Sequence, residues 1–165
     1  MKELKGGLYL VVDPAMEENT LLINVSKALE GGVDVLQIWN NWSGVQNKSA
    51  VIAAICSLAH QHNVPVIINE EWELLMHSNI DGVHFDNPPE DLSIIRTRIG
   101  RDFISGITCG NDLGRIKWAT DNGFSYISFC SMFPSPLAGV CEIVKPETVT
   151  RARQMTTLPS QFSVQ

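Results

Sequence analysis

The chain has 165 residues, of which 44% are hydrophobic, enough to bury one sizeable core, so we predict a single domain over residues 1–165. It carries 12 Lys and Arg against 18 Asp and Glu, which gives a formal net charge of −6. Nucleic acids and anionic membranes bind cationic surfaces, so we expect neither of them as a partner.

The first apolar run of the chain is predicted to be a strand. Lys2 and Lys5 precede this run, as in a signal peptide, but Asp13 ends it before the usual length of a signal-peptide core. The other apolar stretches are far shorter than the roughly 18 residues of a membrane span. We therefore expect a cytoplasmic protein.

Further along the chain, short apolar runs alternate with helical patterns. Each run ends on a polar side chain, and the six runs cover residues 8–13, 35–37, 64–69, 83–86, 103–108 and 126–131. The helical patterns begin near Glu17, Lys48, Glu71, Leu92, Asp112 and Pro146. The runs are too apolar for half-exposed strands, so the alternation predicts buried parallel strands in a series of βα units.

Several helix ends can be read from single residues. Asn47 or Ser49 can cap the second helix, and Asn111 or Asp112 can cap the helix after the fifth strand. The pair Gly31-Gly32 is predicted to end the first helix through a left-handed conformation.

Unbroken βα alternation leaves two architectures, an open doubly wound sheet or a closed (β/α) barrel. Neither G-x-G-x-x-G nor G-x-x-x-x-G-K-[ST] follows any of the runs, which disfavours a nucleotide-binding doubly wound sheet. We therefore predict an α/β fold of the (β/α) TIM-barrel type. Functional residues of such barrels lie at the carboxyl ends of the strands.

The cysteines are scattered and contain no C-x-x-C pair. This spacing predicts reduced thiols rather than a disulfide framework or a zinc site. The residues concerned are Cys56, Cys109, Cys130 and Cys141.

Six segments carry a likeness to a known family, in the family's order and at about its spacing. They are GLYLVVDP, ALEGGVDVLQ, VPVIINEEWEL, DGVHFDNPPEDL, SGIT and SFCSMFPSP. Together they resemble the thiamine-phosphate synthase (thiamine-phosphate pyrophosphorylase) and TenI family. The resemblance implies a (β/α)8 barrel of thiamine biosynthesis whose ligands are small-molecule thiamine precursors. Its synthase branch couples a pyrimidine methyl diphosphate to a thiazole phosphate and releases pyrophosphate with the help of Mg²⁺.

The resemblance also implies roles for individual residues at the strand ends. The implied catalytic residues are Gln37, Asn69 and Thr108. The implied substrate contacts are Gln37, Trp39, Asn41, Thr108, Ser131 and Ser135. The implied Mg²⁺ ligands are Glu70 and Asp86.

Other family positions carry different residues here. Trp39 and Asn41 stand where the family usually has an Arg and a Lys, and Ala138 stands where it has another Lys. Pro89 replaces a metal-binding Asp, and Cys109-Gly110-Asn111 lacks the His that the TenI branch uses. The sequence therefore predicts a thiamine-phosphate synthase-like protein with a degraded site. The alternative is a catalytically inactive barrel that binds a thiamine precursor or a partner protein.

Each of these residues also has a structural interpretation. Gln37 and Asn69 can bind a ligand or cap backbone groups. Glu70 can bind Mg²⁺ or complement the dipole of the next helix. Trp39 can stack on a ring, fill space or anchor an interface. We expect His84 to be structural.

The sequence ends at LPSQFSVQ, without the Gly-Gly loop that follows in the family's later strands. Residues 162–164 are predicted to form a seventh strand or part of one. The sequence thus predicts a barrel truncated after six or seven βα units. Because open strand edges are normally paired or covered, we expect a homodimer.

Overall fold

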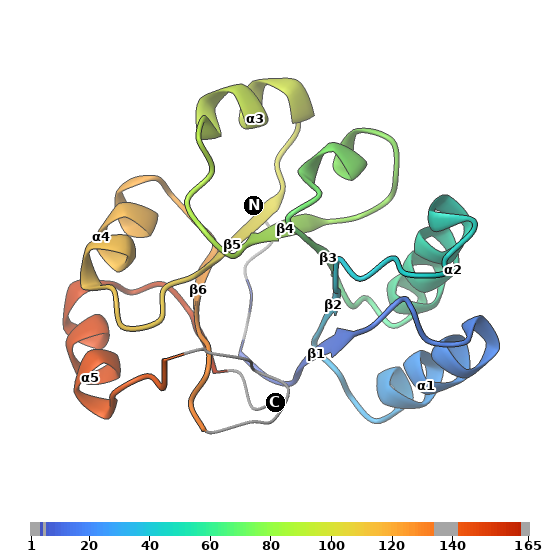
Figure 1. The fold of residues 1–165 in the computed structure, drawn as a ribbon, viewed down its shortest axis with the longest axis horizontal. Helices are drawn as coiled ribbons and strands as arrows, with labels where there is room; N and C mark the ends of the chain where they lie inside the picture. Colours follow the sequence, from blue (N-terminus) through green and yellow to red (C-terminus); the bar gives the residue numbers. More distant parts are fainter. Residues whose placement is uncertain (1–3, 5, 134–141, 163–165) are drawn as a thin grey trace. The chain divides into compact units, whose positions relative to one another are not determined.

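The computed structural model describes residues 4, 6–133 and 142–162. These residues form two compact units. The first comprises Gly6–His84 and Asp91–Ile104, and the second comprises Leu4, Phe85–Glu90 and the described residues of Ser105–Gln165. In both units strands and helices alternate along the chain (Figure 1).

The first unit holds the first four strands. Its elements are β1 (Tyr9–Val12), α1 (Glu18–Glu30), β2 (Val35–Ile38), α2 (Lys48–Gln61), β3 (Val66–Asn69), the 3-10 helix η1 (Trp72–Met76), most of β4 (Gly82–Phe85) and α3 (Leu92–Ile99). The strands β1, β2, β3 and β4 are paired in parallel in that order. Figure 1 shows α1 and α2 on the same side of β1 and β2.

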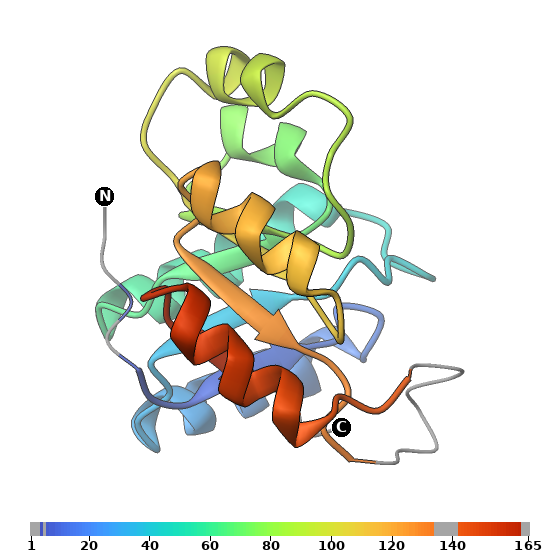
Figure 2. The same ribbon diagram turned by 90° about the vertical axis from the view of Figure 1, so that its left-hand side faces the viewer.

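The second unit holds the remaining strands. Its elements are most of β5 (Ile104–Thr108), α4 (Leu113–Asp121), β6 (Tyr126–Phe129), α5 (Pro146–Met155) and β7 (Ser160–Phe162). The strands β5, β6 and β7 are paired in parallel. Helices α4 and α5 lie side by side (Figure 2), and the Thr120 hydroxyl donates to the Thr156 hydroxyl at 2.8 Å.

The order of the seven strands in the sheet is their order in the sequence, from β1 to β7. A doubly wound sheet instead reverses its strand order at a switch point. The fold is therefore of the predicted α/β TIM-barrel type. All four residues of each of β2, β3, β4 and β6 are buried, which confirms that these strands are covered on both faces.

The helix ends follow from local chemistry. Asn47, not Ser49, caps α2 by accepting a hydrogen bond from the N–H three residues on, at 3.0 Å. Asp112, not Asn111, caps α4 in the same way at 3.0 Å. After α1 the left-handed conformation falls on Gly32, whose φ is +91°. The sequence thus predicted the right segments and left the choice between neighbouring residues open.

Most strand ends differ from the predicted runs by one or two residues, and three elements differ in a way that matters here. The sixth strand ends at Phe129 rather than at residue 131. The short helix after β3 is the 3-10 helix η1, whose five residues suit this tighter form. The seventh strand covers Ser160–Phe162 rather than 162–164, and residues 163–165 lie outside the described residues.

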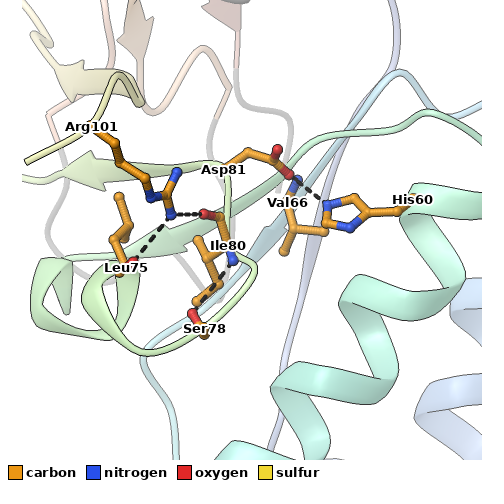
Figure 3. A network of polar contacts seen from close by, with 7 residues as sticks. All are labelled: His60, Val66, Leu75, Ser78, Ile80, Asp81 and Arg101. Atoms are coloured by element: carbon orange, nitrogen blue, oxygen red, sulfur yellow. Dashed lines mark hydrogen bonds and ion pairs between the residues drawn. The ribbon is translucent and has the colours of Figure 1, made fainter. Parts of the chain in front are cut away.

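A polar network joins α2 to the amino ends of β3 and β4 (Figure 3). The Oδ2 atom of Asp81 lies 2.8 Å from Nε2 of His60 and accepts a hydrogen bond from the N–H of Val66 at 2.9 Å. The amino ends of barrel strands serve stability rather than chemistry. This network therefore belongs to the scaffold.

The cysteines agree with the sequence where they are described. Cys56, Cys109 and Cys130 are reduced thiols, and Cys141 lies outside the described residues. Burial raises the pKa of both Cys56 and Cys109 to about 12, so both stay protonated near neutral pH. No helix in the described part of the chain is long and apolar enough to cross a membrane.

Candidate active site

One face of the sheet in the first unit carries polar side chains. Residues paired across parallel strands point to the same face, and the faces alternate along each strand. The register pairs Gln37 with Ile67 and Asn69 with His84, so Gln37, Asn69 and His84 share this face. Tyr9 lies on it too, because its partner on β2 is two residues before Gln37. The opposite face is apolar and is formed by Leu10, Val12, Leu36, Ile38, Val66, Ile68 and Val83.

Gln37 is buried, with 7% of its surface exposed, and its side chain has a fixed orientation. The Tyr9 hydroxyl donates to Oε1 of Gln37 at 2.6 Å. Within the described residues, the fully buried side-chain N and O atoms without a partner are Trp42 Nε1 and Arg115 Nε. The Nε2 atom of Gln37 donates to no described residue, and it is not among these fully buried atoms without a partner. Gln37 therefore has a hydrogen-bond donor that no described residue engages.

The chain turns sharply after Asn69, at the carboxyl end of β3. The carbonyl oxygen of His84 accepts from Asn69 Nδ2 at 3.3 Å and from the N–H of Glu70 at 2.8 Å. Glu70 has a φ of +63°, a left-handed conformation that is rare for residues other than glycine. Such strained residues cluster at functional sites. Glu70, the predicted Mg²⁺ ligand, is thus held in a strained turn at the functional end of the strand.

His84 is uncharged at neutral pH. Only 5% of its surface is exposed, and burial lowers the pKa of its imidazole to about 4. A neutral imidazole can donate and accept hydrogen bonds but brings no positive charge to a phosphate. This environment agrees with the structural role expected for His84.

Two predicted substrate contacts lie after β2. Trp39 is 45% exposed, so its ring is open to solvent. Asn41 is half-buried, and its Nδ2 donates to Oδ2 of Asp13 at 3.0 Å. Asp13 follows β1, so this bond holds together the segments that leave two neighbouring strands.

A cation not predicted from the sequence lies beside this loop. The Nζ atom of Lys48, the first residue of α2, lies 2.9 and 2.8 Å from the two carboxylate oxygens of Glu71. It also lies 4.5 Å from the centre of the Trp42 ring. Glu71 follows β3 by two residues, so Lys48 places a positive charge at the carboxyl ends of these strands.

The second unit has a polar face of its own. Thr108 pairs with Ser128, which pairs with Gln161, so the three side chains share a face. The hydroxyl oxygens of Thr108 and Ser128 are 3.1 Å apart. The Tyr126 ring fills the space that a side chain at Gly106 would need. Thr108 therefore lies within a hydroxyl pair beside a closely packed aromatic ring.

Arg115 organises the end of β5 in the second unit. Its Nη1 atom donates to the carbonyl oxygens of Thr108 at 2.8 Å and Asp86 at 3.0 Å. Its Nη2 atom donates to Oδ1 of Asn87 at 3.2 Å. Asp86 is exposed, so its carboxylate is open to solvent. One guanidinium thus contacts the main chain of two predicted site residues.

The last two predicted contacts follow β6. Ser131 is buried, and its hydroxyl donates to the carbonyl oxygen of Phe133 at 2.6 Å. Ser135 lies outside the described residues. Ser131 is therefore engaged with its own loop.

The structure groups the predicted residues by unit. Gln37 and Asn69 share one polar face of the first unit, and Thr108 lies on the polar face of the second. The predicted Mg²⁺ ligands are divided, with Glu70 in the first unit and Asp86 in the second. The described residues contain no group of three or more His, Cys, Asp or Glu that could hold a metal ion.

The family model described as thiamine monophosphate synthase matches residues 8–161. The chain belongs to this family. The thiamine-phosphate synthase of Aromatoleum aromaticum is 29% identical over 153 residues, which cover 93% of this chain and 74% of that protein. The family predicted from the six segments is thereby confirmed.

Two solved structures share the fold of this thiamine monophosphate synthase family member. The thiamine phosphate pyrophosphorylase of Pyrococcus furiosus has a TM-score of 0.72 at 16% identity and covers 95% of this chain and 75% of its own. The N-acetylmannosamine-6-phosphate 2-epimerase of Clostridium perfringens has a TM-score of 0.59 at 13% identity, over 96% of this chain and 86% of its own. At these identities the likeness shows the fold alone, and the same fold carries different reactions.

Three residues of this family member were not predicted from its sequence, namely Tyr9, Lys48 and Arg115. Lys48 and Arg115 each lie in the first turn of a helix, where the helix dipole disfavours a cation. That unfavourable placement is the signal that could have identified them. Tyr9 has no such signal, because its role depends on the register of β1 against β2.

Proposed function

We propose that this protein binds thiamine precursors and couples a pyrimidine methyl diphosphate to a thiazole phosphate, with release of pyrophosphate. Two observations support this proposal. The amides of Gln37 and Asn69 are buried on the polar face of the first unit, and the chain belongs to the thiamine monophosphate synthase family. Buried amides are costly unless their groups are used. The Asn69 amide already donates to the carbonyl oxygen of His84, and a ligand that accepts from Nε2 of Gln37 accounts for the second buried amide, near the carboxyl end of β2.

The proposed roles follow from the chemistry of each group. The Nε2 atom of Gln37 donates to a ring nitrogen or a phosphate oxygen of the substrate. Asn69 and Thr108 orient reacting groups through hydrogen bonds, since fixed geometry lowers the barrier of a reaction between two bound substrates. We also propose substrate contacts for Trp39 and Asn41 after β2 and for Ser131 after β6, and for Ser135, which lies outside the described residues.

The carboxylates of Glu70 and Asp86 fit Mg²⁺ by their chemistry. Mg²⁺ prefers hard oxygen ligands and commonly uses one or two carboxylates together with substrate phosphates. Both side chains end in carboxylate oxygens of this type. Asp86 is exposed and Glu70 is half-buried. When bound, Mg²⁺ would neutralise charge on the departing diphosphate.

We further propose that turnover is slow, because the site is degraded. Trp39 and Asn41 are neutral where the resemblance implies two cations. Lys48 is paired with Glu71, and Arg115 is occupied by main-chain carbonyls, so neither is a direct replacement. These same features favour the second candidate function, a catalytically inactive barrel that binds a thiamine precursor or a partner protein.

One assay separates the two candidates. The purified chain is given the pyrimidine diphosphate, the thiazole phosphate and Mg²⁺, and thiamine phosphate is measured with and without a chelator. Turnover in the wild type that is lost in Gln37→Ala and kept in Gln61→Ala supports the synthase. Gln61 is an exposed glutamine at the end of α2 and serves as the matched control. Binding of the pyrimidine diphosphate or the thiazole phosphate without turnover supports the second candidate. Absence of turnover and of binding refutes the synthase and leaves, of the second candidate, only the binding of a partner protein.

The remaining features of the proposal concern the whole molecule. We propose a single domain over residues 1–165 that acts in the cytoplasm as a homodimer and does not bind nucleic acid. Val11 on β1 is 47% exposed and Phe162 on β7 is 39% exposed, and burial of such apolar side chains favours association. Sedimentation at micromolar concentration tests the dimer, and a monomer there would refute it.

A further inference from the structure

Arg115 makes contacts that no local requirement of its helix explains. It lies in the first turn of α4, and its guanidinium bonds to the carbonyl oxygens of Thr108 and Asp86 and to the side chain of Asn87. Asp86 directly follows β4, and Thr108 is the last residue of β5. The guanidinium therefore joins the segments at the carboxyl ends of two strands.

The position of Arg115 carries two unfavourable features. Its charge lies at the positive end of the α4 dipole, where the N-cap Asp112 supplies a carboxylate but the first turn itself holds no acidic residue. Its Nε atom is fully buried and has no partner within the described residues. A buried donor without a partner is costly. The three contacts of the guanidinium must outweigh both costs. The stability of α4 therefore does not explain why an arginine stands at this position.

We propose that Arg115 is a positioning residue that sets the spacing between Asp86 and Thr108. This inference rests on the proposed function, in which Asp86 binds Mg²⁺ and Thr108 orients the substrate. The main chain of both residues is held by one planar group at 3.0 and 2.8 Å. Displacement of a reacting group by about 1 Å can reduce a rate about 100-fold, so such spacing matters for turnover.

Only arginine supplies this geometry. Its donors lie in a rigid plane, so Nη1 can hold the carbonyls of Asp86 and Thr108 while Nη2 holds the side chain of Asn87. A lysine keeps the charge but concentrates its donors at one flexible point. Arg115→Lys therefore removes the fork while it leaves the electrostatic field of the site largely unchanged.

The chain offers a matched control in Arg101. Its Nη2 atom donates to the carbonyl oxygens of Leu75 and Ile80 at 3.1 and 2.7 Å (Figure 3). Arg101 follows α3, and the carbonyls that it holds belong to η1 and to the segment before β4. It is thus a guanidinium with similar main-chain contacts at a place where no site residue was predicted.

The test compares Arg115→Lys with Arg101→Lys. Thiamine phosphate formation gives kcat and KM, and hydrogen exchange reports on residues 86–90 and 108–112. We expect Arg115→Lys to lower kcat about 10- to 100-fold and to speed exchange in both segments, while Arg101→Lys changes neither. We also expect millimolar guanidinium to restore part of the rate in Arg115→Ala, which a purely structural loss would not allow. A wild-type kcat in Arg115→Lys overturns the inference.

Failure of the proposed function gives a different result. In that case the wild type forms no thiamine phosphate, whatever the variants do. Hydrogen exchange and the binding of Mg²⁺ with pyrophosphate, measured by calorimetry, then decide the role of Arg115. Faster exchange in both segments together with weaker binding in Arg115→Lys alone supports the spacing role. Unchanged exchange in residues 86–90 and 108–112 overturns it.

Discussion

The hydroxyl of Tyr9 donates a 2.6 Å hydrogen bond to the side-chain oxygen of Gln37, across the first two strands of the sheet. This bond fixes the orientation of the amide and uses one of the two lone pairs of its oxygen, which leaves the NH₂ group as the unengaged end of the side chain. The bond therefore determines which kind of substrate atom Gln37 can recognise. The proposed partner of this N–H group is therefore an acceptor, such as a ring nitrogen or a phosphate oxygen.

Tyr9→Phe keeps the ring and removes this bond. One hydrogen bond contributes about 1 kcal/mol, so we expect the affinity for the pyrimidine diphosphate to fall about fivefold as the Gln37 amide becomes free to rotate. Calorimetric titration measures this affinity. In a Gln37→Ala background the same change should have no further effect. Losses that simply add up in the double variant would show that Tyr9 acts independently of Gln37.

His84 predicts a loss of stability in mild acid. Burial lowers the pKa of its imidazole to about 4 in the folded protein, whereas an unfolded histidine has a pKa of about 6.5. Below pH 6.5 the unfolded chain therefore binds a proton that the folded chain does not. The stability due to neutral His84 is complete above pH 6.5 and falls as the pH drops toward 4, by about 3 kcal/mol in total.

Urea unfolding at several pH values between 7 and 4 measures this effect. We expect His84→Gln to flatten the dependence of the unfolding free energy on pH. His62→Gln is the control, because His62 is exposed at the end of α2 and its replacement should leave the dependence unchanged. An equally steep dependence in His84→Gln would show that other groups cause the acid sensitivity.

Much of this fold could be predicted from the sequence, because the strands are continuous apolar runs that end on polar residues. The carboxyl ends of β3 and β5 fall on Asn69 and Thr108, as predicted. The contacts between Tyr9 and Gln37 and between Arg115 and Asp86 could not, because each joins residues 28 or 29 positions apart. Such contacts depend on strand register and on side-chain rotamers, which hydrophobic periodicity does not determine.

For the candidate site, the sequence predicted which residues follow the strands but not their backbone conformation or their contacts. The family resemblance named Glu70 from its place after Asn69. Its left-handed φ of +63° has no signal in the sequence, because glutamate has no preference for that conformation. The positive charge of Lys48 was likewise predictable, but its pairing with Glu71 was not. In each case the missing information is the path of a loop after a strand.

Glu70→Gly tests whether the strained turn serves function. Glycine adopts a positive φ without the steric cost that other residues meet, so we expect a gain of up to about 1 kcal/mol in the free energy of unfolding. We also expect the Mg²⁺ dependence of turnover to weaken, because a carboxylate is lost. Urea unfolding and Mg²⁺ titration measure the two effects. Asn63→Gly is the control, since Asn63 has a φ of +59° at the end of α2.

That control changes a similar backbone conformation without removing a carboxylate. Asparagine tolerates the left-handed region better than glutamate, so Asn63→Gly should alter stability only slightly and leave Mg²⁺ dependence unchanged. A Glu70→Gly variant that gains stability and keeps its full Mg²⁺ response would remove Glu70 from the metal site. A loss of stability would instead mean that contacts of the Glu70 side chain outweigh the strain.

Lys48 holds a positive charge beside the segment that follows β3, although its pairing with Glu71 distinguishes it from an unpaired cation. Its ammonium is shared between Glu71 and the Trp42 ring, and the Lys48 and Glu71 side chains are 36% and 32% exposed. An ion pair so accessible to solvent contributes at most about 1 kcal/mol to stability. A phosphate can therefore compete with Glu71 for this charge at little cost to the fold.

This competition predicts opposite effects for two substitutions. Lys48→Met should weaken pyrophosphate binding several-fold, because one charge-assisted contact is lost. Glu71→Gln should strengthen it, because the ammonium no longer has a charged protein partner. Calorimetry in buffer of low ionic strength measures both, and added salt should reduce the difference. Lys117→Met is the control, since Lys117 pairs with Asp121 on α4 and both side chains are exposed. If Lys48→Met and Lys117→Met bind pyrophosphate equally well, Lys48 serves only to attach the start of α2 to the segment after β3.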